Sequence, residues 1–232
     1  MLPLKDTIPT RRFPVVTVVL IAINLAVWIF VQKAGTEPGL TQSVNDYAFR
    51  SCEVQSGCEP TGESWLLTAI TSMFLHGSWM HLLGNMLFLW IFGNNVEDAM
   101  GRLRFPVFYV LGGLVATAIQ SIVTIEWGSA AAETIPSVGA SGAVAAVLGA
   151  YIVLHPGAVV LTWIAPIFLI PLPAILYLGI WFALQLFLGG ASFTAPEEGG
   201  GIAYFAHIGG FAFGVLAVRL FTASPGRRLA PW

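Results

Sequence analysis

The sequence predicts an all-α fold, a polytopic membrane bundle of six transmembrane helices. Two observations lead to this prediction. Of the 232 residues, 56% are hydrophobic and only 9% are charged, whereas soluble domains carry roughly 25% charged residues. No charged residue occurs between Glu133 and Glu197. That run is too long and too apolar for the core of a soluble domain, so we expect the lipid bilayer around it.

Six apolar segments are interpreted as the spans. They cover residues 15–31, 71–92, 105–125, 138–154, 172–188 and 203–221. Each is expected to be a helix, because a helix satisfies its backbone polar groups within the segment. The first ends in Trp28-Ile29-Phe30 instead of a small-residue cleavage site, so it is interpreted as an anchor. The predicted organisation is a tail at 1–13, a six-span domain at 14–222 and a tail at 223–232.

Charged residues orient the bundle. A long polar loop is expected at 33–64 and a short charged loop at 93–104. Most basic residues fall in the tails or beside the short loop, namely Lys5, Arg11, Arg12, Arg102, Arg104, Arg219, Arg227 and Arg228. Lys33 and Arg50 fall on the other side. The positive-inside rule therefore predicts that both termini are cytoplasmic. The short tails and the six-span form suit a bacterial-type plasma membrane.

The polar loop at 33–64 contains both cysteines of the chain, Cys52 and Cys58. A local disulfide and a pair of free thiols both fit this spacing. No metal site is expected there, because no further Cys and no nearby His joins the pair. No basic patch suggests a nucleic-acid partner.

Several polar residues are predicted to lie at the outer end of the bundle. In the predicted topology the second, fourth and sixth spans all run from outside to inside. His81 and Asn85 lie early in the second span and share a helix face, because they are four residues apart. Ser141 begins the fourth span and His207 lies near the start of the sixth. Polar residues inside spans are costly, and they usually face a bundle interior or a wet cavity.

Small residues predict that the fourth and sixth spans pack closely. The sixth span contains Gly210-x-x-x-Gly214, which lets another backbone approach. The fourth span offers a matching set of small residues: Gly142, Ala143, Ala145, Ala146, Gly149 and Ala150. Close packing of these two helices would bring His207 to Ser141.

These residue types are the parts required for acyl transfer. Ser141 is a candidate nucleophile and the His207 imidazole a candidate base. The Ser141 N–H lies at a helix start, where free amides favour negative charge, and His81 and Asn85 offer further donors for an oxyanion. The Asp residues, Asp6, Asp46 and Asp98, fall in loops or tails, so the prediction is a dyad. Their placement argues against an aspartyl intramembrane protease, and the absence of His-Glu-x-x-His argues against a zinc protease.

Taken together, the sequence resembles the rhomboid family of intramembrane serine proteases. Four matching stretches occur in the family's order: His76-Gly-Ser-Trp-Met-His81-Leu-Leu-Gly-Asn85, Gly93-Asn-Asn-Val-Glu97-Asp98, Gly139-Ala-Ser141-Gly142 and Ala206-His207-Ile-Gly-Gly210-x-x-x-Gly214. The resemblance covers essentially the whole chain. It implies a rhomboid-like fold and hydrolysis of peptide bonds in or next to the transmembrane segments of substrate proteins. It implies no metal and no organic cofactor.

The resemblance also implies a role for each matching residue. Ser141 and His207 would form the catalytic dyad, and His81 and Asn85 would stabilise the oxyanion. The supporting roles fall to His76, near the cavity, and to Gly139, which lets the backbone bend beside the nucleophile. Glu97 matches an acidic loop residue that makes structural hydrogen bonds.

Two positions depart from the family pattern. The first loop has no clear counterpart of an arginine that follows a tryptophan in many relatives. Ala145 stands where some relatives place a tyrosine against the catalytic histidine, so Tyr204 and Phe205 become candidates to support His207.

Two other interpretations stay open at this point. The first is a non-catalytic rhomboid-like protein that binds transmembrane helices; it keeps the fold but not the chemistry. The second is a small transporter, which would need ionisable residues along a midplane pathway, and the third and fifth predicted spans contain none.

Overall fold

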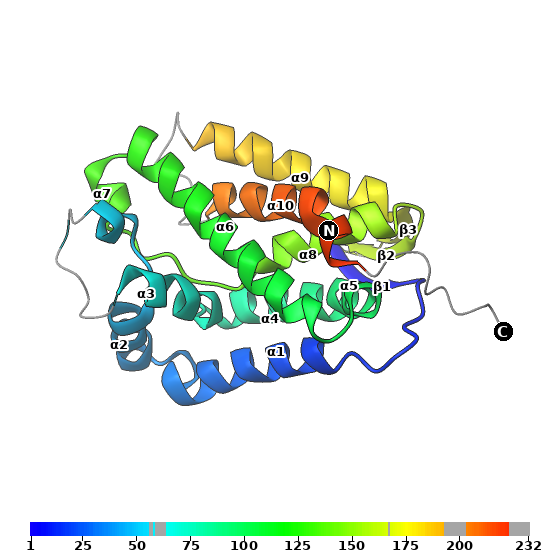
Figure 1. Ribbon diagram of the computed structural model, residues 1–232, viewed down its shortest axis with the longest axis horizontal. Coiled ribbons are helices and arrows are strands. Elements are labelled where there is room, and N and C mark those ends of the chain that lie inside the picture. The colour runs from blue at the N-terminus through cyan, green and yellow to red at the C-terminus, as the bar shows by residue number, and fades with distance from the viewer. Residues whose placement is uncertain (56–57, 59–63, 167, 193–202, 223–232) are drawn as a thin grey trace.

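The computed structural model is a bundle of helices lying roughly along one direction, with a small sheet at one end (Figure 1). It describes residues 1–55, 58, 64–166, 168–192 and 203–222, so the predicted tail at 223–232 lies outside the described residues. The architecture confirms the predicted helical membrane bundle. Three of the described helices are long and apolar enough to cross a membrane by themselves: Arg104–Trp127, Ala174–Ala191 and Tyr204–Phe221. The number of spans stays a prediction.

The N-terminal third of the chain contains more helix than the predicted tail, single span and long loop. The first predicted span is α1 (Val15–Ala26) continued by a π-helical turn, η1 (Val27–Val31). The predicted loop contains η2 (Lys33–Gly35), α2 (Glu37–Tyr47) and η3 (Ser51–Gln55), and it is followed by α3 (Trp65–Thr71) and η4 (Ser72–Phe74). Cys52 and Cys58 form a disulfide.

The second predicted span is shifted toward its C-terminus. Its helix begins at Trp79, where the Ser78 side chain caps it, and not near residue 71. It comprises α4 (Trp79–Phe88), a π-helical turn η5 (Leu89–Gly93) and α5 (Asn94–Met100). The predicted charged loop at 93–104 is therefore wrong over most of its length. The helix continues because Glu97 is buried and hydrogen-bonded within the protein, so its charge does not mark a solvent loop.

The remaining helices follow the predicted spans closely. They are α6 (Arg104–Trp127), the short α7 (Ala130–Glu133), α8 (Ser141–Leu154), α9 (Ala174–Ala191) and α10 (Tyr204–Phe221). The last of the described helices, α10, packs against α6, α8 and α9, in the middle of the bundle in Figure 1.

Glycines let α8 and α10 approach closely, as predicted. A Cβ on Gly210 would collide with the carbonyl oxygen of Gly142, and one on Gly214 would collide with that of Ala146. From the other side, a Cβ on Gly149 would collide with the carbonyl of Phe211. Backbone therefore meets backbone along this interface, and larger residues would push the helices apart.

A three-stranded antiparallel sheet, which the sequence does not predict, lies at one end of the bundle. It consists of β1 (Leu2–Asp6), β2 (Val159–Ile164) and β3 (Phe168–Pro173) in the order β1-β2-β3. The β1–β2 register pairs Leu2 with Trp163 and Asp6 with Val160. A strand in the 1–13 tail depends on a partner more than 150 residues away, so local pattern does not reveal it.

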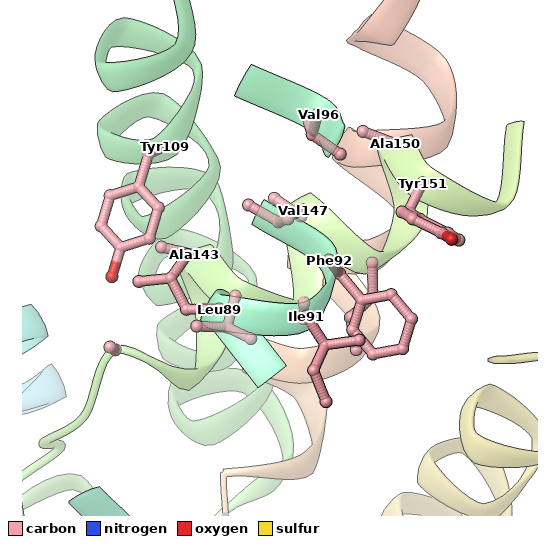
Figure 2. Close-up of a cluster of buried hydrophobic side chains, with 14 of the residues drawn as sticks. Leu89, Ile91, Phe92, Val96, Tyr109, Ala143, Val147, Ala150 and Tyr151 are labelled. Carbon is pink, nitrogen blue, oxygen red and sulfur yellow. The ribbon is translucent and has the colours of Figure 1, made fainter. Parts of the chain in front are cut away.

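A hydrophobic cluster packs α8 against η5, α5 and α6 (Figure 2). Its labelled members come from η5, α5, α6 and α8: Leu89, Ile91, Phe92, Val96, Tyr109, Ala143, Val147, Ala150 and Tyr151. Phe92 and Tyr151 meet edge to face, with ring centroids 4.9 Å apart. This core holds the helix that begins with Ser141.

Candidate active site

Ser141 is the first residue of α8 and is half-buried. The backbone that leads to it is held from two sides. Ser137 N donates to Phe49 O over 2.7 Å, and Gly139 N donates to Ser72 O over 2.9 Å. The Ser141 side chain thus projects from a fixed turn at a helix start, where free amide groups favour negative charge.

Gly139 brings the imidazole of His81 to this turn. Its φ is +126°, a conformation that L residues rarely adopt. A Cβ added at Gly139 would lie 2.7 Å from both Cε1 and Nε2 of His81 and 3.7 Å from Ser141 Oγ. The His81 ring therefore rests on the bare backbone of Gly139, beside the hydroxyl of Ser141.

The surroundings of His81 favour one tautomer. Ser78 Oγ accepts from the His81 backbone N–H over 3.1 Å and caps α4. Gly77 N donates to His81 Nδ1 over 3.5 Å, at the long end of the hydrogen-bond range. An Nδ1 that accepts leaves the proton on Nε2. The Nε2–H donor then lies on the side of Gly139 and Ser141.

His76 contacts Asn85 and not the nucleophile. It precedes α4, in contrast to the prediction that it lies within the second span. Gln32 holds its backbone in both directions, with Nε2 donating to His76 O over 2.8 Å and Oε1 accepting from His76 N over 2.9 Å. Its Nε2 lies 3.1 Å from Asn85 Nδ2. Since the amide nitrogen is a donor, His76 accepts there and fixes the side chain of Asn85.

His207, on α10, is held by Gln185, which was not among the predicted site residues. Its Nδ1 lies 2.8 Å from Oε1 of Gln185 on α9. Gln185 Nε2 donates to the carbonyl of Trp181 over 3.4 Å, which orients the amide. The amide oxygen accepts, so His207 carries its proton on Nδ1 and keeps Nε2 free to accept. The signal for Gln185 was present, because it is the only amide side chain in the predicted fifth span.

The aromatic support of His207 also comes from α9. The ring of Trp181 lies 5.8 Å from the imidazole, tilted by 37°. On α8 the buried Ala145 provides no ring for His207, and Tyr204 and Phe205 remain the candidates that the sequence suggests. Trp181 precedes Gln185 by one helical turn, so one face of α9 presents both contacts.

The structure brings the neighbours of Ser141 and His207 together. The Cβ position of Gly142 lies 3.8 Å from the carbonyl oxygen of Ala206 and 3.9 Å from its Cβ. Among the described residues, no hydrogen bond joins Ser141 Oγ to His207, whose side chain bonds to Gln185 instead. In enzymes without bound substrate this contact is often long, and it shortens in the complex.

A cavity of about 40 Å³ adjoins Ser141 between α6, α8 and α10. Ser72, Thr117, Gln120 and Ser137 are among its polar lining residues. A buried water needs roughly 10–15 Å³ and two or more polar partners, so the cavity has room for water. Within the described part of the chain, no group of three His, Cys, Asp or Glu residues is arranged to hold a metal ion.

Comparisons with known proteins agree on one family. Residues 63–224 match the family model described as "Rhomboid domain". The chain is 33% identical over 152 residues to "Rhomboid protein 1, mitochondrial" of Saccharomyces cerevisiae, covering 65% of this chain and 40% of that protein. It is 32% identical over 91 residues to "Presenilin-associated rhomboid-like protein A, mitochondrial" of Danio rerio, covering 39% and 23%. "RHOMBOID-like protein 12, mitochondrial" of Arabidopsis thaliana is 32% identical over 163 residues, covering 66% and 45%.

The chain matches only part of each of these relatives, and their names state a location. The chain spans less than half the length of each of the three. Their names place them in mitochondria, so they lend no support to the expected bacterial-type plasma membrane. The apolar helices and the matched domain both indicate an integral membrane protein.

Proposed function

Since this chain belongs to the rhomboid family, we propose that it is an intramembrane serine endopeptidase with Ser141 as nucleophile and His207 as base. Its substrates are membrane proteins, cut in or next to a transmembrane segment. In this proposal the domain at 14–222 has six spans, both termini lie on the cytoplasmic side, and the site opens toward the other side of the membrane.

The hydrogen bond between His207 and Gln185 carries the proposal. A general base must present an unprotonated nitrogen to the nucleophile. The bond occupies Nδ1 and leaves Nε2 as that nitrogen. The helix that carries it is pressed against the start of α8 by the contacts of Gly142 and Gly210.

The residues then act in order. Nε2 of His207 takes the proton of Ser141 as Oγ bonds to the substrate carbonyl carbon. The resulting oxyanion accepts from the Ser141 backbone N–H, from His81 Nε2–H and from the Nδ2 group of Asn85. The His207 imidazolium gives its proton to the leaving amine as the C–N bond breaks. An acyl-enzyme remains on Ser141, and a water deprotonated by His207 hydrolyses it and restores the hydroxyl.

Two supporting features of the site match these steps. The cavity lined by Ser72, Gln120 and Ser137 can supply the water for hydrolysis in an otherwise apolar bundle. His76 and Gly139 act through their neighbours: His76 orients Asn85, and Gly139 gives His81 room beside Ser141. No step calls for a metal or an organic cofactor.

A second candidate is a non-catalytic rhomboid-like protein that binds transmembrane helices. The observation in its favour is that Ser141 Oγ is not hydrogen-bonded to His207 within the described structure. Both candidates bind a transmembrane segment of another protein. They differ in whether a bound substrate is cut.

The experiment is cleavage of a transmembrane substrate by the full chain in proteoliposomes. Ser141→Ala and His207→Ala should each abolish cleavage and labelling by a fluorophosphonate probe. His155→Gln, at the other end of α8, should retain both and serves as the matched control. Helix binding without turnover by the wild-type chain, across a panel of substrates, would establish the second candidate instead.

A further inference from the structure

The sheet lies at the end of the bundle opposite the start of α8 (Figure 1). Strand β2 begins five residues after α8 ends at Leu154, and β3 passes directly into α9 at Ala174. The chain therefore enters and leaves this hairpin from two apolar helices. Its depth in the membrane is fixed by them, close to the level where those helices end.

The β2–β3 hairpin exposes apolar side chains. Phe168 is 58% exposed, Leu169 57% and Trp163 38%. No residue between 134 and 196 is charged. A hairpin in water normally has one polar face, and this one has none. Aromatic residues such as Trp163 are typical of the membrane–water boundary.

The outer edge of β3 lacks two of its outward-pointing donors. The register pairs Pro171 with Leu161 and Pro173 with Val159. A proline has no N–H to give to a partner strand, so both must stand at positions whose N–H would point away from β2. Two outward donors are thus absent. Such an edge resists pairing with another strand, and it costs less to place in a weakly hydrated layer.

Exposed basic side chains surround the sheet at the same end. Arg104 donates to the carbonyl of Phe221 at the end of α10, and Arg102 donates to that of Phe13 before α1. The exposed cations at this end are Lys5, Arg11, Arg12, Arg102, Arg104 and Arg219. Of the acidic residues at this end, Glu97 is buried, Asp6 is hydrogen-bonded to Asn95 and Tyr151, and the half-buried Asp98 accepts from the Arg11 backbone N–H. The surface around the hairpin is therefore positive.

We propose that the β2–β3 hairpin lies in the membrane interface, at the boundary between the headgroups and the acyl chains of an anionic leaflet. The hairpin cannot lie at the hydrocarbon centre, because its outer strand edge is unpaired. Its uncharged apolar tip makes a position in bulk water unfavourable. The cations around it pair with lipid phosphates and fix the bundle's depth. This inference rests on the membrane bundle and is independent of the proposed protease chemistry.

The test places a fluorescent thiol label at Leu169→Cys in the full chain. The chain has no free cysteine among its described residues, so the new thiol is the one labelled. The protein is reconstituted in vesicles of phosphatidylcholine with or without phosphatidylglycerol. Two quenchers are compared: a lipid nitroxide placed just below the headgroup, and acrylamide on both sides of the vesicle. Gln42→Cys, exposed on α2 at the other end, is the control site.

The label at Leu169→Cys should lose most of its emission to the lipid nitroxide and little to acrylamide, while Gln42→Cys shows the reverse. Phe168→Cys should repeat the result and guards against a folding defect of one variant. Adding Lys5→Gln and Arg219→Gln should reduce nitroxide quenching in vesicles with phosphatidylglycerol only. Quenching by acrylamide equal to that at Gln42→Cys would overturn the proposal and point to a protein partner, and quenching insensitive to the anionic lipid would overturn its charge component.

Discussion

His207 and Gln185 are joined by a 2.8 Å hydrogen bond between Nδ1 and Oε1 that links α10 to α9. It occupies the position where many serine hydrolases use a carboxylate. An uncharged amide fixes the tautomer without placing a second charge in an apolar bundle, where an unpaired carboxylate would cost several kcal/mol. The prediction of a dyad from the lack of a suitably placed Asp therefore needs a refinement: the proposed base has an orienting partner, which is neutral.

Replacing Gln185 should impair the base without removing it. Gln185→Leu keeps the volume but leaves the His207 Nδ1–H without an acceptor, so we expect kcat to fall about a hundredfold, as for other misplaced catalytic groups. Gln185→Glu retains an acceptor at the same place and should recover much of that loss, with a changed pH profile. The measurement is cleavage in proteoliposomes across pH. Equal loss in both variants would mean that Gln185 only packs.

Gly139→Ala should inactivate the site. A Cβ would enter the space of the His81 ring, and alanine disfavours φ of +126°. We expect loss of cleavage and of fluorophosphonate labelling. Gly84→Ala is the control, because nothing lies within 4 Å of its added Cβ, and it should stabilise α4 by about 0.5–1 kcal/mol. Normal turnover by Gly139→Ala would show that His81 is not required beside Ser141.

Gly214→Ala should separate α10 from α8. The added methyl would collide with the carbonyl of Ala146, and overpacking of this kind costs about 1–3 kcal/mol. Both the melting temperature in detergent and the rate of cleavage should fall. Gly179→Ala on α9 has open space around it, so it should leave the cleavage rate unchanged and should not lower the melting temperature. An unchanged melting temperature for Gly214→Ala would contradict the close backbone contact.

Glu97 should be a principal anchor of α1. Its carboxylate accepts from Val16 N, Thr17 N and Thr17 Oγ1 at 2.8–3.0 Å, at the positive end of the helix dipole. Glu97→Ala leaves these donors unpaired, at about 1–3 kcal/mol for each buried one. Thermal unfolding should show a clear drop. Asp98→Asn, whose partner is the exposed Arg11 N–H, should show a small one.

The stability of the sheet end should depend on pH through Asp6. Burial raises the pKa of the Asp6 carboxyl above its usual 3.8. The folded state thus holds the proton more tightly, and this stabilisation is complete below about pH 3.8 and is lost as pH rises through the folded pKa. Asp6→Asn cannot titrate. Its melting temperature relative to wild type should therefore rise with pH across the acidic range, and a constant difference would contradict the shift.

Much of the helical fold follows from hydropathy, but not its ends. The third, fourth and sixth predicted spans match α6, α8 and α10 within a few residues. The second is displaced, because the charged residues Glu97 and Asp98 predict a solvent loop but lie within α5. Strand β1 could not be foreseen, because its stability comes from a partner beyond residue 158. Long-range pairing leaves no local signature.

The sequence predicts which residues belong to the candidate site better than it predicts how they contact one another. Ser141, His207, His81 and Asn85 could be grouped from orientation and spacing alone. That His76 bonds to Asn85, and that Gln185 bonds to His207, depends on side-chain directions across different elements. Gln185 stands out in the sequence as a polar residue in an apolar span, but the sequence does not indicate which helix its side chain faces.

The central position of α10 bears on how the protein is made. This helix contacts α6, α8 and α9, yet it is the last of them to leave the ribosome. Until it arrives, the glycine face of α8 has no partner and Gln185 has no histidine to hold. Chains form their N-terminal parts first during synthesis. A nascent chain that already displays Ser141 therefore lacks the proposed base, so the proposed proteolysis would have to wait until α10 has joined the bundle.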